Sequence, residues 1–129
     1  MLAPTDEQYL RSKDLEFEVS IDQGLICVVV KNYPLPSGYD RPSTDLLLRL
    51  PAGFPDAQPD MFWCDPPIRI ASSAIFPQAA DLMESYLGRT WQRFSRHLNV
   101  GAWTPGTDNL GTYMSLVGAE LQRSLAGPR

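Results

Sequence analysis

The sequence of 129 residues has little sulfur and almost no histidine: His97 is its single histidine, and Cys27 and Cys64 are its two cysteines. A structural zinc site needs four Cys or His ligands at close spacing, and His97 stands far from both cysteines. We therefore expect no metal site. Both cysteines fall in apolar, strand-like segments, where a free thiol packs as a small hydrophobe, so we expect a reduced, cytoplasmic setting.

Long apolar runs and basic stripes are also missing. No stretch approaches the roughly 18 apolar residues that span a bilayer, and residues 1–10 lack the basic start and apolar core of a signal peptide. The 11 basic residues are outnumbered by 15 acidic ones, which gives a net charge of −4. No basic patch with interleaved aromatic residues suggests nucleic acid. We expect one domain, residues 1–129, that sits in the cytoplasm and binds neither membrane nor nucleic acid.

Four segments have the patterns of strands. Residues 15–22 alternate strictly between apolar and polar side chains, which predicts a half-buried strand. Gln23-Gly24 predicts a tight turn into residues 25–31, whose apolar run indicates a more central strand. Residues 44–50 and 60–64 follow proline-rich links that cannot themselves form central strands. Four strands joined by short links predict an antiparallel meander.

Two helices and one short helical stretch are expected beside this sheet. Thr5 to Gln8 fits a capping box, which predicts a short N-terminal helix. Residues 79–87 predict one or two helical turns that stop at Gly88. A long amphipathic helix, with Thr107 or Asp108 as its N-cap, is predicted by apolar residues that recur at helical spacing. These residues are Leu110, Tyr113, Met114, Val117 and Leu121. The predicted fold class is α+β, with the helices covering one sheet face.

Residues 88–110 concentrate the side chains that carry chemistry. Ser95 is a candidate nucleophile, but a serine hydroxyl needs a base, and histidine is the residue type that exchanges protons near neutral pH. In an extended chain His97 projects to the same side as Ser95, whereas on a helix the two diverge. Arg93 and Arg96 are candidates for stabilising an oxyanion or positioning the substrate. The structural alternative is a loop serine, a bracing histidine and solvated arginines.

Other residues have two readings as well. Arg89, Trp91 and Trp103 are candidate partner-binding residues, although arginines are commonly solvated and tryptophans often anchor loops to the core. Asp108 orients a substrate amine in one reading and caps a helix in the other. Cys64 is a second candidate nucleophile, but the neighbouring acid would raise the pKa of its thiol.

The joint pattern resembles the ubiquitin-conjugating (UBC-like) fold over residues 15–125. The segment FPDAQP (54–59) is similar to the proline-rich link into the fourth strand of that fold, and WTP (103–105) is similar to the Trp-x-Pro that starts its covering helix. The segments GRTWQRFSRH (88–97) and WTPGTDNL (103–110) resemble a bacterial branch, the prokaryotic ubiquitin-conjugating family E.

The resemblance implies a function and also shows two departures. The family's cysteine stands eight residues before the tryptophan, and Ser95 takes that position. Of the family's His-Pro-Asn, residues 75–78 keep only the proline. The resemblance implies an acyltransferase that accepts an activated ubiquitin-like protein from an adenylating enzyme onto Ser95 as an oxyester and passes it to a protein target, without metal or organic cofactor. The alternative is a non-catalytic UBC-variant or RWD-like interaction module, and a third class is an unrelated α+β enzyme that uses Cys64.

Overall fold

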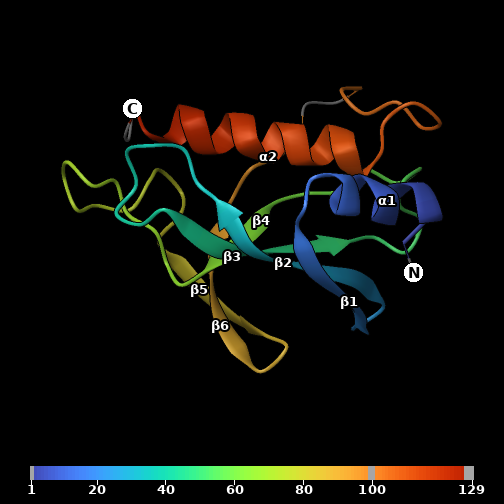
Figure 1. The fold of residues 1–129 in the computed structure, drawn as a ribbon, viewed down its shortest axis with the longest axis horizontal. Helices are drawn as coiled ribbons and strands as arrows, with labels where there is room; N and C mark the ends of the chain where they lie inside the picture. Colours follow the sequence, from blue (N-terminus) through green and yellow to red (C-terminus); the bar gives the residue numbers. More distant parts are fainter. Residues whose placement is uncertain (1, 99–100, 127–129) are drawn as a thin grey trace.

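The computed structural model describes residues 2–98 and 101–126, and within them the chain forms two helices and one six-stranded antiparallel sheet (Figure 1). The sheet order is β1-β2-β3-β4-β6-β5. The α+β class and the four-stranded meander are confirmed, but the expected sheet was two strands too small. The elements are α1 (Pro4–Ser12), β1 (Glu16–Asp22), β2 (Leu25–Pro34), β3 (Ser43–Leu50), β4 (Phe62–Asp65), β5 (Leu82–Tyr86), β6 (Arg89–Phe94) and α2 (Leu110–Ser124).

The two extra strands form a hairpin, so the prediction of helical turns over residues 79–87 is wrong. β5 and β6 pair from Leu82–Arg93 to Tyr86–Arg89, and Leu87-Gly88 closes the turn with φ angles of 55° and 73°. Two successive residues with positive φ match the twist of a hairpin, which explains the glycine there. β6 also pairs with β4, so it joins the hairpin to the meander. In Figure 1 the hairpin projects from the side opposite α2.

The apolar stripe of α2 covers one face of the sheet, as predicted. Leu46, Leu48 and Leu50 of β3 are fully buried in the same core as that stripe, and α1 packs against α2. The opposite face has a smaller core around Trp63 and Trp91. Within the described residues, neither helix has the length and apolar character needed to cross a bilayer.

Two arginines lie over aromatic rings on that second face. The Arg49 guanidinium is 3.8 Å from the centroid of the Tyr86 ring, and the Arg89 guanidinium is 4.4 Å from the centroid of the Trp91 ring. A guanidinium at this distance from a ring is attracted by its π electrons. The helices therefore cover one face of the sheet, and the side chains of Arg49 and Arg89 cover part of the other.

The N-cap of α2 is Asn109, so the expected cap at Thr107 or Asp108 is wrong. The Asn109 side chain accepts the Thr112 N–H at 3.2 Å, and the Thr112 hydroxyl accepts the Asn109 N–H at 3.3 Å. Asp108 is not free to cap because its carboxylate accepts the Thr104 N–H at 2.7 Å.

The predicted capping box at Thr5 is also wrong. α1 begins at Pro4, Ala3 is its N-cap, and no side chain bonds to that cap. Proline suits the first turn of a helix because its fixed φ is already helical and its missing N–H would have no helical partner.

We expect Asn109→Ala to lower the free energy of unfolding by about 1 kcal/mol, because it removes the side-chain acceptor of a capping box. Thr107→Ala is the matched control, since Thr107 is exposed, and it should change stability by less than about 0.5 kcal/mol. Chemical denaturation of both variants measures the difference. Equal losses would mean that the cap assignment is wrong.

Asp6 joins α1 to the start of α2 from a buried position. Its side chain is 2% exposed, Oδ1 accepts the Leu110 N–H at 3.3 Å, and Oδ2 has no hydrogen-bond partner among the described residues. Burial raises the pKa of this carboxyl from its ordinary value, and the bond from Leu110 offsets only part of that effect. The folded protein therefore holds the proton at pH values at which the unfolded chain has released it.

The stabilisation from this proton is fully present below the unfolded-state pKa of Asp6 and is lost as pH rises through its folded-state pKa. Asp6→Asn keeps the acceptor for Leu110 but cannot ionise, so we expect its stability relative to the wild type to increase as pH rises through that window. Denaturation at a series of acidic to neutral pH values measures this trend. Asp14→Asn, at an exposed aspartate just after α1, is the control, and parallel profiles for wild type and Asp6→Asn would contradict the assignment.

Candidate functional site

Ser95 follows β6 directly and is half-buried. Its N–H donates to the Ala79 carbonyl at 3.0 Å, and its Oγ accepts the Arg93 Nε–H at 3.2 Å. The residue borders a surface hollow of ≈ 280 Å³ between the end of β6 and the last turns of α2. We call this the serine hollow. It is lined by Gln78, Ala79, Ser95, Arg96, Glu120, Arg123 and Ser124.

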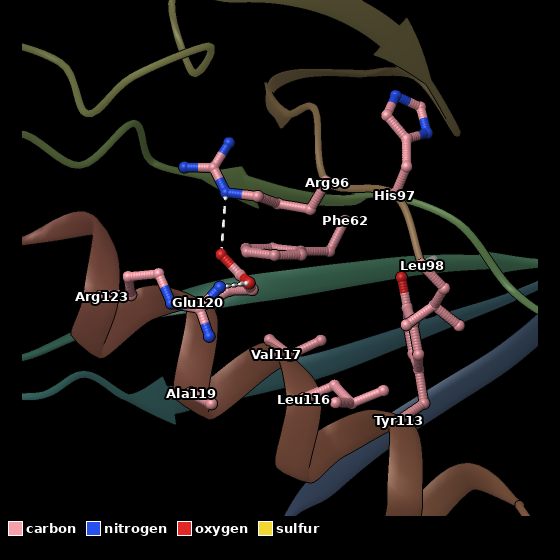
Figure 2. Close-up of a pocket in the computed structure, with 10 residues that line it drawn as sticks. All are labelled: Phe62, Arg96, His97, Leu98, Tyr113, Leu116, Val117, Ala119, Glu120 and Arg123. Carbon is pink, nitrogen blue, oxygen red and sulfur yellow. Dashed lines mark hydrogen bonds and ion pairs between the residues drawn. The ribbon is translucent and has the colours of Figure 1, made fainter. Parts of the chain in front are cut away.

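His97 is directed to a different partner. Its side chain is 62% exposed, and Nδ1 lies 2.8 and 2.9 Å from the two carboxylate oxygens of Asp60. Across the described part of the chain, no hydrogen bond joins His97 to Ser95. Figure 2 shows its ring at the rim of a second depression and turned away from α2. Ser95 and His97 are therefore close along the chain, but their side chains bond to different residues, Arg93 and Asp60.

The second depression is mostly apolar, and we call it the apolar groove (Figure 2). It runs between α2 and the segment after Ser95, and the Tyr113 ring stands beside Leu98 at one end. Arg96, Glu120 and Arg123 belong to both this groove and the serine hollow, so they separate the two. The remaining lining residues are Phe62, His97, Leu98, Tyr113, Leu116, Val117 and Ala119.

Arg96 connects the serine segment to α2. Its Nη1 donates to the Ser95 carbonyl at 3.0 Å, Nη2 donates to the Ser124 hydroxyl at 2.8 Å, and Nε lies 3.3 Å from the Glu120 carboxylate. Glu120 also pairs with Arg123 at 2.8 Å. Because Arg96 is committed to these contacts, the guanidinium that reaches the Ser95 hydroxyl itself is that of Arg93.

Arg93 places a positive charge beside the serine hydroxyl. Its Nη1 pairs with Glu84 of β5 at 3.2 Å, while its Nε holds Ser95 Oγ. The Glu84 carboxylate in turn accepts the Trp63 indole N–H at 2.9 Å. The β5–β6 hairpin thus fixes the position of the guanidinium beside the hydroxyl.

The four candidate partner-binding residues do not gather around Ser95. Arg89 pairs with Asp45 at 3.0 Å and with Asp65 at 2.9 Å on the second sheet face. Burial alone would lower the pKa of this guanidinium, but hydrogen bonds and charges from the two carboxylates outweigh it and raise the pKa. Trp91 is fully buried and donates its indole N–H to the Tyr86 carbonyl at 3.0 Å.

Trp103 and Asp108 serve the segment before α2. Trp103 is 7% exposed and donates its indole N–H to the Pro55 carbonyl at 2.8 Å. Asp108 closes the turn that starts at Thr104. These contacts tie the start of the helix to the proline-rich link between β3 and β4.

The buried cysteine is poorly placed for chemistry. Cys64 is fully buried in the helix-covered core, and burial first, with the Asp65 carboxylate second, raises the pKa of its thiol far above the usual range. A thiol must ionise to act as a nucleophile, so Cys64 lacks both exposure and thiolate. Within the described residues, His, Cys, Asp and Glu side chains do not gather in any group of three or more that could hold a metal ion.

Three residues at or behind the candidate site are not among the site residues predicted from the sequence. Gln78 lines the serine hollow, and its signal was its place directly after Pro77, where the resembling family has an asparagine. Asp60 is 37 residues from His97 along the chain, and no local pattern links them. Gln92 is a fully buried polar residue within β6.

Gln92 holds the wall of the hollow in place. Its amide donates to the Ile68 carbonyl at 3.0 Å and to the Ala80 carbonyl at 2.8 Å, and its carbonyl accepts the Ile68 N–H at 2.8 Å. Ala80 follows Ala79, whose carbonyl accepts the Ser95 N–H. The buried amide of Gln92 therefore holds the irregular segment that contains Gln78 in place.

An α+β domain with a serine directly after the sheet, followed by Trp-x-Pro and a helix across one sheet face, has the organisation of an E2-like domain. The family model described as prokaryotic E2 family E matches residues 2–124. The chain therefore belongs to prokaryotic E2 family E. The family implies a carrier whose partners are a ubiquitin-like protein and a target. Neither the curated proteins nor the solved structures contain a significant match to the chain.

We expect Gln92→Met to lower the free energy of unfolding by about 3 kcal/mol or more, because an apolar side chain of similar length leaves three buried backbone groups without partners. Gln122→Met, at an exposed glutamine of α2, is the matched control and should be nearly neutral. Thermal and denaturant unfolding of the two variants measure the difference. A loss for Gln92→Met no larger than that of the control would contradict this role of the amide.

Proposed function

We propose that this protein accepts the C-terminal acyl group of a ubiquitin-like protein on Ser95 Oγ as an oxyester and then transfers it to a protein target. The observation that carries the proposal is the position of the hydroxyl. Ser95 stands eight residues before Trp103, where the family's cysteine is expected, and it borders a hollow rather than the core. An adenylating enzyme that supplies the activated acyl group belongs to the same proposal.

In this proposal, Arg93 makes the Ser95 hydroxyl a better nucleophile toward the acyl group. In the acylation step the Ser95 oxygen bonds to the acyl carbon, and the hydroxyl proton passes to water. The bond between the acyl carbon and the activating group breaks, and that group leaves with the bonding electrons. The guanidinium 3.2 Å from Oγ favours the negative charge that builds on that oxygen. The same guanidinium also pairs with Glu84. This ion pair weakens the stabilisation of charge on Ser95 Oγ, but it fixes the position of the guanidinium.

Gln78 takes the place of the family's asparagine in this proposal. Gln78 is one of the residues that line the serine hollow, and an amide N–H is a suitable donor to the oxyanion of a tetrahedral intermediate. A single donor of this kind is worth about 10²–10³ in rate in other acyl-transfer enzymes. Arg96 has a positioning role, since it fixes the Ser95 carbonyl against α2.

The second candidate is a non-catalytic module of the same fold that binds a partner without chemistry. Two observations favour it: among the described residues, no side chain that could act as a base accepts a hydrogen bond from the Ser95 hydroxyl, and an apolar groove lies close by. The two candidates differ in whether a covalent adduct forms at Ser95.

Incubation with the cognate activating enzyme, the ubiquitin-like protein and ATP, followed by intact-mass measurement, tests the adduct. We expect a single adduct that survives thiols and is released by mild base, because an oxyester resists thiols better than a thioester does. Ser95→Ala should abolish it. Ser72→Ala, at an exposed serine outside the hollow, is the matched control and should retain it.

Ser95→Cys sharpens the assay, since the adduct of this variant should become labile to thiols. A thiol-labile adduct on the wild-type protein would instead point to a cysteine. If the activating enzyme carries the activated ubiquitin-like protein but no adduct forms on this protein, the result would favour the non-catalytic module.

A further inference from the structure

The pair formed by Asp60 and His97 is not used by the acylation step. The imidazole Nδ1 lies between two carboxylate oxygens at 2.8 and 2.9 Å, while the ring is 62% exposed. Figure 2 shows the ring at the rim of the apolar groove, beside the segment that leaves Ser95. The second ring nitrogen, Nε2, takes no part in the contact with Asp60, and it belongs to a residue two positions after Ser95.

The chain holds Asp60 in this place with unusual backbone geometry. Met61, the next residue, has a φ of 62°, a left-handed conformation that costs energy for a residue with a side chain. Its N–H donates to the Arg96 carbonyl at 2.9 Å, and its carbonyl accepts the Tyr113 hydroxyl. Pro59 on the other side is buried. The carboxylate is thus presented to His97 from a backbone fixed on both sides.

The carboxylate decides which ring nitrogen carries the proton. A neutral imidazole has one N–H donor and one acceptor, and a carboxylate can only accept. Nδ1 must therefore carry the proton to bind Asp60, and Nε2 keeps its lone pair. A free histidine side chain in water favours the opposite tautomer, so the Asp60 contact changes the chemistry of the ring.

His97 is close to Ser95 along the chain, and its free ring nitrogen is not committed to the serine hydroxyl. Two residues of fully extended chain span at most about 7 Å, which limits the separation of the Ser95 and His97 Cα atoms. The hydroxyl itself is held by Arg93. A base that is not bonded to the Ser95 hydroxyl suits the transfer step, in which a target amine attacks the Ser95 ester.

We propose that His97 is the proton acceptor for a primary amine of the target that attacks the Ser95 ester, and that Asp60 is its positioning residue. The inference rests on the proposed function, because it requires the oxyester. An exposed ion pair contributes little to stability, so a structural role alone would not require this pair.

The step balances as follows. Nε2 takes one proton from a lysine ammonium, and the freed amine nitrogen bonds to the ester carbonyl carbon. The nitrogen then loses a second proton to solvent. The bond between the carbonyl carbon and Ser95 Oγ breaks, and Oγ takes the proton held by His97. The products are an amide on the target, a free serine hydroxyl and a neutral imidazole.

The single histidine makes the first test direct, because the ring nitrogens of the free protein give one unambiguous set of ¹⁵N signals. In alkaline buffer, where the ring is neutral, we expect the proton on Nδ1 in the wild type. Asp60→Ala should move it to Nε2, while Glu7→Gln, which alters another surface ion pair, should leave it on Nδ1. A wild-type proton on Nε2, or no change in Asp60→Ala, would overturn the positioning role.

The second test measures release of the Ser95 adduct by two small amines. With lysine, which must lose a proton before it attacks, we expect His97→Ala and Asp60→Ala to slow release by about 10²-fold. With hydroxylamine, which is already neutral, both variants should stay close to the wild type, as should Glu7→Gln with either amine. Equal slowing with both amines, or none with lysine, would overturn the proton-acceptor role.

The two proposals fail in different ways. The tautomer is measured on the protein alone, so its outcome does not depend on conjugation. If the wild-type protein never forms an adduct, the proposed function is overturned. If an adduct forms but lysine releases it equally fast from the wild type and from both variants, only the inference about His97 and Asp60 is overturned.

Discussion

The position of Arg96 is the constraint on which the rest of the site depends. Its side chain binds the Ser95 carbonyl, the Ser124 hydroxyl and Glu120, while its own carbonyl accepts the Met61 N–H. One residue thus fixes the serine segment to α2 and the loop after β3 to the serine segment. These contacts join three parts of the chain that no single β-ladder or helix would hold together, and they give the serine hollow and the apolar groove a common wall.

Much of the fold was predictable because local burial dictates it. The alternation in β1, the leucines of β3 and the stripe of α2 all repeat with the period of their element, and the structure follows them. The β5–β6 hairpin was missed because β5 is an edge strand: Leu82 and Met83 are exposed, so no alternation marks it. The cap of α2 was misplaced by one or two residues because a turn occupies Asp108 first.

The site was predictable only where it depends on position along the chain. Ser95 was found by its distance from Trp103, and Arg93 by its nearness to Ser95. The partner of His97 was not predictable, since Asp60 reaches it through a left-handed Met61 and a contact from α2, neither of which has a local signal. The tryptophans chosen as partner contacts lie inside instead, because each indole N–H satisfies a backbone carbonyl that the fold would otherwise leave without a partner.

The common wall between the two depressions has a consequence for the order of events. Because Arg96, Glu120 and Arg123 stand between them, a molecule that fills the serine hollow leaves the apolar groove open, and the reverse is also true. Under the proposed function, a donor and an acceptor that approach from these two sides need not displace one another. The two depressions therefore give the candidate site two sides of approach, with Ser95 lining one and His97 lining the other.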